Sequence, residues 1–339
     1  MRSWIRGAGI LPLWLIAVPV SVYGQTKSQQ LRPQDRVRLV EARRLADRVG
    51  EQVWPGLSRT AFQVLLVSDS AEFLLGHPEP AAQFAPLGYD STLKSEVWTR
   101  PRQFPPTLLA TFPAVGGLPT VVIGSAERTG KSSTAWALTL LHEHFHQWQY
   151  SQRDYYPGVA RLNLSRGDTT GQWMLDYPFP YDSVPIQQAM HKLATALVQS
   201  LNVPPARRPT TLHAAAAARD TLRSRLTPAD YRYFEFQLWQ EGVARFIEYS
   251  AARAAAQAEE PSTQFRRLPD YEPYSKVAGN VRQSLRRELE QLDLGRQHRV
   301  AFYPLGAAIA LLLDETSPDW KRAYTNRPFE LAALLPDAR

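Results

Sequence analysis

The octapeptide Leu141-His142-Glu143-His144-Phe145-His146-Gln147-Trp148 contains the pattern H-E-x-x-H at His142, Glu143 and His146. On an α-helix, residues four apart lie on one face, so both imidazoles can reach a Zn²⁺ ion at about 2.0 to 2.1 Å. Glu143 lies beside them, where its carboxylate can act on a metal-bound water. The octapeptide therefore predicts a helix that binds a metal ion. The alternative is a polar helix that carries the pattern by chance.

The third histidine of this stretch has a different helical phase. At 100° per residue, His144 falls near an apolar stripe that includes Leu141 and Phe145, roughly opposite His142 and His146. It cannot bind the same ion as they do. We expect His144 to be a core histidine with a hydrogen-bond partner rather than a catalytic group.

A catalytic zinc site normally has three protein ligands and a water, so a third ligand must lie elsewhere. The longer pattern H-E-x-x-H-x-x-G-x-x-H fails, because Gln149 occupies the glycine position and Gln152 the final histidine. No glutamate occurs between His146 and Glu235, and Glu241 is the next one. Glu235 lies about 120° from Glu241 around one helix, so both are not expected to serve. The remaining candidates are His191, His213, Asp154, Asp168 and Asp176.

Glu241 has the best local context. It precedes Gly242, which costs about 1 kcal/mol inside a helix relative to Ala, and close approach to the metal-binding helix would explain that glycine. Glu248 follows seven residues later and could support a ligating histidine through a hydrogen bond. The alternative for Glu241 is an exposed ion pair with Arg245 at i, i+4.

Together, H-E-x-x-H and the later Trp239-x-Glu241-Gly242 segment resemble the gluzincins, the thermolysin and zinc-aminopeptidase branch of metallopeptidases. The resemblance implies a zincin-like fold, with one Zn²⁺ bound by His142, His146 and Glu241. The segment from Tyr303 to Gly306 resembles the Y-x-x-G of aminopeptidase-like members, and Tyr303 would then stabilise the oxyanion; its alternative is simple packing.

The chain also departs from that branch. His146 and Glu241 are 95 positions apart, which requires a large insertion with helices of its own between the ligands. The Gly-x-Met-Glu-Asn segment of the aminopeptidases is absent, so recognition of a substrate's N-terminal amine is not implied. Glu143 would act as the general base on the zinc-bound water. We expect the strand at Pro119 to Ile123 to be a sheet edge that pairs with an extended peptide.

The pattern of apolar residues predicts an α+β fold. Residues 25–130 are expected to form a small lobe with one helix and a sheet, and residues 131–339 a mainly helical lobe that carries the H-E-x-x-H helix. The expected strands are Ala61 to Val67, Phe73 to Leu75, Glu96 to Thr99 and Pro119 to Ile123. The expected helices are Gln34 to Glu51, Ser133 to Tyr150, Val184 to Leu201, Thr211 to Leu226, Pro228 to Ala256, Val281 to Leu292 and Phe302 to Leu313.

Two further segments have alternative interpretations. Ser125 to Ser132 follows a strand and opens a helix, as a phosphate-binding loop would, but it begins with Ser instead of Gly. The alternative is a polar loop in which Ser132 or Ser133 caps the helix. The aromatic residues Trp148, Tyr150, Trp173 and the loop Tyr177 to Tyr181 could line a substrate pocket or belong to the core.

The first 24 residues are typical of a secretory signal peptide, with Arg2 and Arg6 before an apolar segment from Ile10 to Val20. No later stretch is apolar enough to span a membrane. The chain has no cysteine, which excludes disulfides and thiolate ligands. Its net charge of +7 is spread along the chain, so nucleic-acid binding is not expected.

The sequence therefore predicts an exported zinc metallopeptidase, periplasmic or extracellular, that acts on a peptide or protein substrate. One alternative is a non-catalytic metal-binding or scaffold protein that has kept the zincin fold. Another is a hydrolase of a different amide, such as cell-wall peptides. The sequence does not distinguish endopeptidase from exopeptidase action, and it indicates no oligomeric state.

Overall fold

Helix α1 (Pro33–Val53) begins with a proline at its first position, where the missing N–H costs no hydrogen bond. Its buried face includes Leu39, Leu45 and Val49, which confirms the helix predicted over 34–51. The computed structural model describes residues 30–258 and 260–336. The predicted signal peptide at residues 1–24 lies outside this range.

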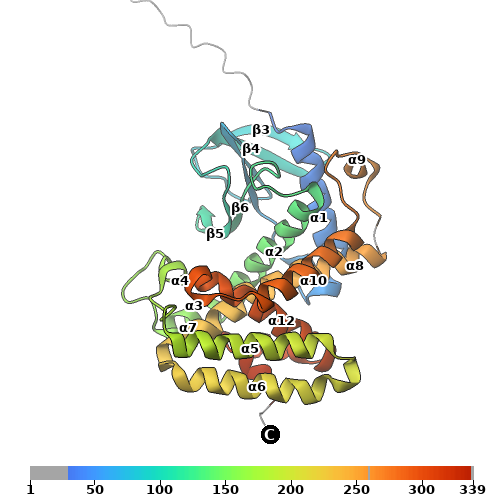
Figure 1. Ribbon diagram of the computed structural model, residues 1–339. Coiled ribbons are helices and arrows are strands. Elements are labelled where there is room, and N and C mark those ends of the chain that lie inside the picture. The colour runs from blue at the N-terminus through green and yellow to red at the C-terminus, as the bar shows by residue number, and fades with distance from the viewer. Residues whose placement is uncertain (1–29, 259, 337–339) are drawn as a thin grey trace, which may run out of the picture. The chain divides into compact units, whose positions relative to one another are not determined.

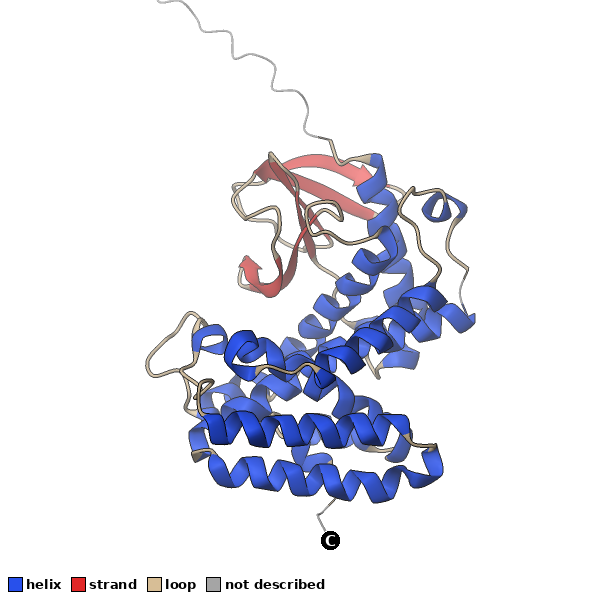
Figure 2. Ribbon diagram, in the orientation of Figure 1, coloured by secondary structure: helices blue, strands red, loops and turns tan. Residues whose placement is uncertain are grey.

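A six-stranded mixed sheet follows α1 (Figures 1 and 2). The strand order is β3-β4-β2-β1-β6-β5, and β1 and β6 are the one parallel pair. The strands are β1 (Val64–Val67), β2 (Ala71–Leu75), β3 (Ala85–Asp90), β4 (Ser95–Pro101), β5 (Leu109–Val115) and β6 (Leu118–Gly124). The four predicted strands are confirmed with shifted ends.

The two strands that the sequence does not predict, β3 and β5, are the edges of the sheet. β3 is almost fully exposed, and its Pro86 and Gly88 are residue types depleted in strands, which hides the short alternation of Ala85, Leu87 and Tyr89. β5 contains Pro113, which an edge strand tolerates because one row of its N–H groups faces away from the sheet. The expectation that the strand at Pro119 to Ile123 is an edge is wrong, because β6 pairs with β1 on one side and β5 on the other.

Helices form the rest of the described chain, and α5 and α6 run side by side (Figure 1). The predicted helices are present as α2 (Ser133–Ser151), α5 (Val184–Asn202), α6 (Arg208–Arg225), α7 (Pro228–Gln237), α8 (Val243–Ala258), α10 (Tyr274–Glu290) and α12 (Phe302–Thr316). Short helices that the sequence analysis did not predict are α3 (Tyr155–Leu162), α4 (Trp173–Asp176), α9 (Thr263–Arg266), α11 (Leu294–Gln297) and α13 (Trp320–Asn326).

The helix predicted over Pro228 to Ala256 is present, and one turn inside it departs from α-helical pairing. Between α7 and α8 lies η3 (Leu238–Gly242), a single π-helical turn that contains Glu241. Turns of this kind interrupt the regular ladder of hydrogen bonds within a helix and are frequent at functional sites. Glu241 therefore lies in a π-helical turn, so its side chain does not follow regular α-helical spacing.

Gly242 explains how this turn is placed. A Cβ at Gly242 would lie 2.8 Å from the carbonyl carbon of Gly306 on α12, and a Cβ at Gly306 would lie 2.6 Å from the carbonyl oxygen of Leu238. The two backbones thus touch at a pair of glycines. The expectation that Gly242 admits the metal-binding helix is wrong: it admits α12, which carries Tyr303.

The loop before α2 is a capping structure. Ser132 accepts a hydrogen bond from the Ala135 N–H, and the Ser133 N–H donates to Oδ2 of Asp270 at 2.9 Å. A carboxylate of the chain thus occupies the end of the helix where a phosphate would bind. These contacts favour the capping alternative over a phosphate loop.

The described chain from Leu31 onward forms one unit by its contacts. One hydrophobic core contains residues from α1, the sheet and the later helices, with Trp54 in edge contact with Phe145, Trp148, Trp320 and Tyr324. The α+β class is confirmed. In the described ranges, the helices are all too short or too polar to cross a lipid bilayer.

Replacing Gly242 with Ala should destabilise the protein by about 1 to 3 kcal/mol, because the new methyl group meets backbone atoms that cannot rotate away. Gly279 is the matched control: it lies in α10, and a Cβ there meets nothing within 4 Å. Gly279→Ala should stabilise by up to about 1 kcal/mol through its higher helix propensity. Denaturant unfolding measures the free energy of unfolding of both variants, and equal changes would contradict the close backbone contact between Gly242 and Gly306.

Candidate metal centre

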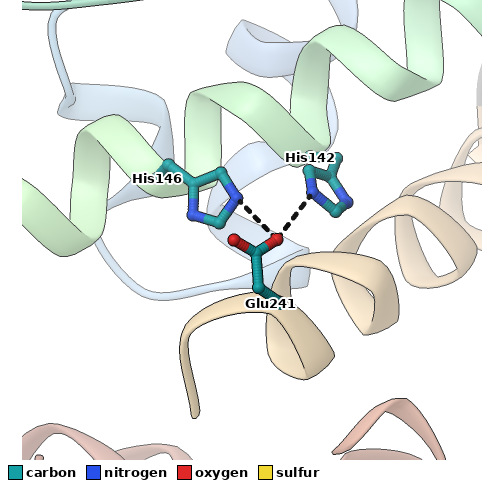
Figure 3. Close-up of side chains that lie close together, drawn as sticks. All are labelled: His142, His146 and Glu241. Carbon is teal, nitrogen blue, oxygen red and sulfur yellow. Dashed lines mark ion pairs between the residues drawn. The ribbon is translucent and has the colours of Figure 1, made fainter. Parts of the chain in front are cut away.

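Two imidazoles from α2 and one carboxylate from η3 point toward a common position (Figure 3). Oε2 of Glu241 lies 3.9 Å from Nε2 of His142 and 3.6 Å from Nε2 of His146. Within residues 30–258 and 260–336, these three residues form the one group of histidine and carboxylate side chains with ligand atoms close enough for a shared ion. All three were predicted as ligands from the sequence.

The distances suit a small metal ion. Two ligand bonds of about 2.0 to 2.2 Å each can span up to about 4.4 Å, and both nitrogen–oxygen distances are shorter than this. His146 is buried, and His142 and Glu241 are partly buried, so few waters compete for these atoms. The donor set of two imidazoles and a carboxylate is one that zinc commonly takes, although other divalent metals accept it too.

The charges of the three groups are coupled. Burial and the neighbouring His146 lower the pKa of His142 to about 3. Burial also opposes a charge on His146, but the Glu241 carboxylate outweighs it and raises the pKa of His146 to about 9. Burial raises the pKa of Glu241, and His146 more than offsets this and lowers it to about 2. Glu241 is therefore a carboxylate ready to bind a cation, and His142 is a neutral imidazole.

Gln149 fixes the orientation of His146. Its Oε1 lies 2.7 Å from Nδ1 of His146, and its Nε2 donates to the carbonyl oxygens of Trp239 and Gln240 and to the Tyr324 hydroxyl. Because the amide nitrogen is committed to these acceptors, Oε1 must be the acceptor for His146. Nε2 of Gln240 lies 3.1 Å from the same Nδ1, so Gln149 is the nearer of its two partners. A proton on Nδ1 faces the Gln149 acceptor, and a metal at Nε2 would displace the second proton that the raised pKa gives the ring.

The same glutamine also contacts η3. Trp239 and Gln240 belong to this π-turn, and the Tyr324 hydroxyl donates a second hydrogen bond to the Trp239 carbonyl. A π-turn changes the pairing of the carbonyls of a helix, and buried carbonyls need partners. Gln149 and Tyr324 provide them. One side chain thus connects a histidine ligand to the turn that carries the carboxylate ligand.

Glu143 is buried beside these ligands. The hydroxyl of Thr111, on the edge strand β5, lies 2.9 Å from Oε2 of Glu143 and 2.9 Å from the backbone carbonyl oxygen of the same residue, so the two oxygens share its one proton. Burial raises the pKa of Glu143, and the positive charge on His146 partly opposes the rise. A carboxylate with a raised pKa is a stronger base than an exposed one.

Tyr303 lies on α12, one turn before the glycine that touches Gly242. Its hydroxyl accepts a hydrogen bond from the guanidinium of Arg299. Burial and then the Glu241 carboxylate raise its pKa well above the ordinary value. Tyr303 therefore stays protonated at neutral pH and keeps a hydroxyl that can donate next to Glu241.

Glu248 does not take the predicted supporting role for a ligand. No hydrogen bond or ion pair joins it to either histidine in the described chain, and Gln149 holds His146 instead. The prediction assumed uniform helical spacing after Glu241, whereas η3 changes the phase of the helix at that point. The alternative ion pair between Glu241 and Arg245 is also absent, since Arg245 pairs with Glu288.

The other candidate ligands lie outside the group of three. Glu235 is buried, accepts a hydrogen bond of 2.7 Å from the Tyr231 hydroxyl and another from the Ala332 N–H, and is thereby committed elsewhere. The remaining candidates that are not part of the group are His191, His213, Asp154, Asp168 and Asp176.

His144 is a core histidine, as predicted. Its Nδ1 lies 2.8 Å from Oε1 of Gln147, and its Nε2 lies 3.2 Å from the Leu57 carbonyl oxygen. Burial lowers its pKa to about 4, so the ring is neutral at physiological pH.

Of the aromatic residues considered for a pocket, Tyr150 lies at the site. Its ring stacks on His146, and its hydroxyl donates to the Thr111 carbonyl. Trp148 and Trp173 belong to the core. In the loop Tyr177 to Tyr181, Tyr177 and Phe179 are buried and Tyr181 is partly exposed.

Comparison with protein-family models finds no match, and neither curated proteins nor solved structures include a similar chain.

Replacing Gln149 with Leu should weaken zinc binding about 10- to 100-fold, because the Nδ1–H of His146 loses its acceptor and η3 loses two donors. Gln147→Leu is the matched control. Gln147 is also buried on α2, faces the Nδ1 of the histidine three residues earlier and donates to two carbonyls, those of Gln63 and Pro119. Competition with a chromophoric chelator gives both affinities, and equal losses would mean that Gln149 has no special effect on the metal.

Proposed function

We propose that the chain is a zinc-dependent hydrolase of gluzincin type that cleaves peptide bonds. The observation that carries the proposal is the convergence of His142, His146 and Glu241, whose ligand atoms all lie within 4.8 Å of one another although the two segments are 95 positions apart. An H-E-x-x-H helix with a downstream glutamate as third ligand is the arrangement that the gluzincin resemblance implies. The raised pKa of Glu143 beside this group supports a hydrolytic role over a structural one.

The residues have separate parts in the proposed reaction. A bound zinc ion would supply Lewis acidity and lower the pKa of a water to about 7. Glu143 would accept the proton of the attacking water and deliver it to the leaving amine. Thr111 holds one carboxylate oxygen of Glu143 at 2.9 Å and thereby restricts its orientation. Tyr303 would donate to the negative charge that develops on the carbonyl oxygen.

The position of β5 supports a peptide as the substrate. This strand is an edge of the sheet, and its Thr111 contacts the proposed base directly. An extended peptide can add to such an edge by main-chain hydrogen bonds. The Tyr150 hydroxyl already occupies the Thr111 carbonyl, so pairing would use the strand on either side of that residue.

The two alternatives from the sequence have less support. A non-catalytic metal-binding or scaffold protein needs no buried base and no tyrosine next to the ligands, yet both are present. Hydrolysis of another amide, such as a cell-wall peptide, would use the same residues, and no contact favours it specifically. An exported location, periplasmic or extracellular, is part of the proposal and rests on residues 1–24 alone.

Replacing Glu143 with Gln should keep zinc bound and reduce kcat/KM for a peptide mixture by about 10²- to 10⁴-fold, the usual contribution of a general base. Glu235→Gln is the matched control, because Glu235 is equally buried and also accepts a hydrogen bond from a hydroxyl, but lies outside the metal group. Zinc content by atomic absorption and peptide cleavage by mass spectrometry give the two readouts. Full activity in Glu143→Gln would refute the proposed mechanism.

A further inference from the structure

We propose that Arg299 is a recognition residue for a carboxylate of the substrate, either its C-terminal carboxylate or an acidic side chain. The inference rests on the proposed function and adds a substrate class to it. Arg299 lies in the 3₁₀ turn η4 (His298–Ala301), directly before α12 and four residues before Tyr303.

The contacts of Arg299 place its guanidinium at the metal centre. It donates to the Tyr303 hydroxyl, and its central carbon lies 5.7 Å from the centre of the Tyr303 ring. Tyr303 in turn adjoins Glu241, because α12 and η3 touch at Gly306 and Gly242. The positive charge of Arg299 also helps to keep the pKa of Glu241 low. A substrate at the proposed catalytic residues would therefore lie next to this cation.

The guanidinium lacks a carboxylate partner. Arg299 is partly buried, and among the described residues no carboxylate lies within ion-pair distance of it, whereas four arginines that are buried all have one. These four are Arg38, Arg100, Arg208 and Arg219. A cation removed from water is costly unless it is paired, and Glu241 is already committed to the two histidines. Arg299 thus has an incomplete set of partners at the site.

The free donors of Arg299 suit a carboxylate. A guanidinium has five N–H groups in a planar fork, and a carboxylate can accept two of them in parallel. The hydrogen bond to Tyr303 uses one. Within residues 30–258 and 260–336 no other acceptor takes the remaining N–H groups, so they can make a bidentate contact that a neutral peptide group would use less well.

The backbone before Arg299 is held in an unusual conformation. His298 has φ 49° and ψ −134°, a combination that residues other than glycine rarely adopt. Its ring stacks on Tyr181 with centroids 4.7 Å apart and planes at 10°. Strain of this kind persists where the surroundings impose it, and it is common at ligand sites.

A competing explanation is that Arg299 only orients the Tyr303 hydroxyl. That role needs one N–H and predicts equal effects on all substrates. Carboxylate recognition predicts a preference among substrates, and this difference can be measured by binding alone.

The test uses zinc-loaded Glu143→Gln protein and calorimetric binding of three pentapeptide mixtures with acetylated N-termini. The first mixture has uncharged side chains and a free C-terminal carboxylate. The second is the same mixture with an amidated C-terminus, and the third is amidated and contains one acidic residue. We expect at least 10-fold tighter binding of the first or the third than of the second. Preference for the first identifies the C-terminal carboxylate, and preference for the third identifies an acidic side chain.

Adding Arg299→Gln should abolish that preference, and Arg299→Lys should retain part of it, since the charge remains but the fork is lost. The matched control is Arg296→Gln, which removes the same charge from an exposed arginine three residues earlier and should keep the full preference. Equal binding of all three mixtures, or a preference that survives Arg299→Gln, would overturn the inference. Hydrolysis by the wild type is measured separately: a preference without hydrolysis refutes the proposed function alone, and hydrolysis without a preference refutes this inference alone.

Discussion

The amide of Gln149 connects the two parts of the metal centre. One end accepts the proton of His146, and the other donates to two carbonyls of the π-turn that carries Glu241. Ligands that lie 95 positions apart are thereby related through one buried side chain. Without it, the imidazole would lose the acceptor at Nδ1 and the Gln240 carbonyl would lose this hydrogen bond, which is unfavourable in a region shielded from water, whereas the Trp239 carbonyl would keep the bond from Tyr324.

A second constraint acts from the other side of the π-turn. The glycine pair Gly242 and Gly306 lets η3 and α12 approach until their backbones touch. Because Tyr303 is one turn away from this contact, the same approach places a protonated hydroxyl next to Glu241 and brings Arg299 with it. The carboxylate ligand, the proposed oxyanion donor and the proposed carboxylate-binding residue are therefore brought together by this one contact between η3 and α12.

The sequence predicts much of this site because the positions within H-E-x-x-H determine which helix face each residue occupies. Helical spacing places His142 and His146 on one face and assigns His144 to the core. Glu241 follows from the lack of glutamates between His146 and Glu235 and from the Gly242 beside it, and Tyr303 follows from a resemblance. The sequence shows Gln149 only as a residue that breaks a longer pattern, because its role depends on the carbonyls of Trp239 and Gln240, about 90 positions away. Strand β5 and the π-turn were missed because an exposed edge with a proline, and one extra residue in a helical turn, leave little trace in apolar periodicity. The sequence does not single out Arg299, because its distinguishing feature is that no carboxylate of the described chain pairs with it.

The most direct test of the account is the zinc K-edge X-ray absorption spectrum of the zinc-loaded protein, recorded with its zinc content. The account predicts one zinc ion per chain, with the scattering of two imidazoles at about 2.0 to 2.1 Å and of a carboxylate oxygen at about 2.0 to 2.2 Å. Replacing Glu241 with Ala should remove the carboxylate oxygen and leave both imidazoles. Failure to bind zinc in stoichiometric amount, or a spectrum with fewer than two imidazoles, would contradict it.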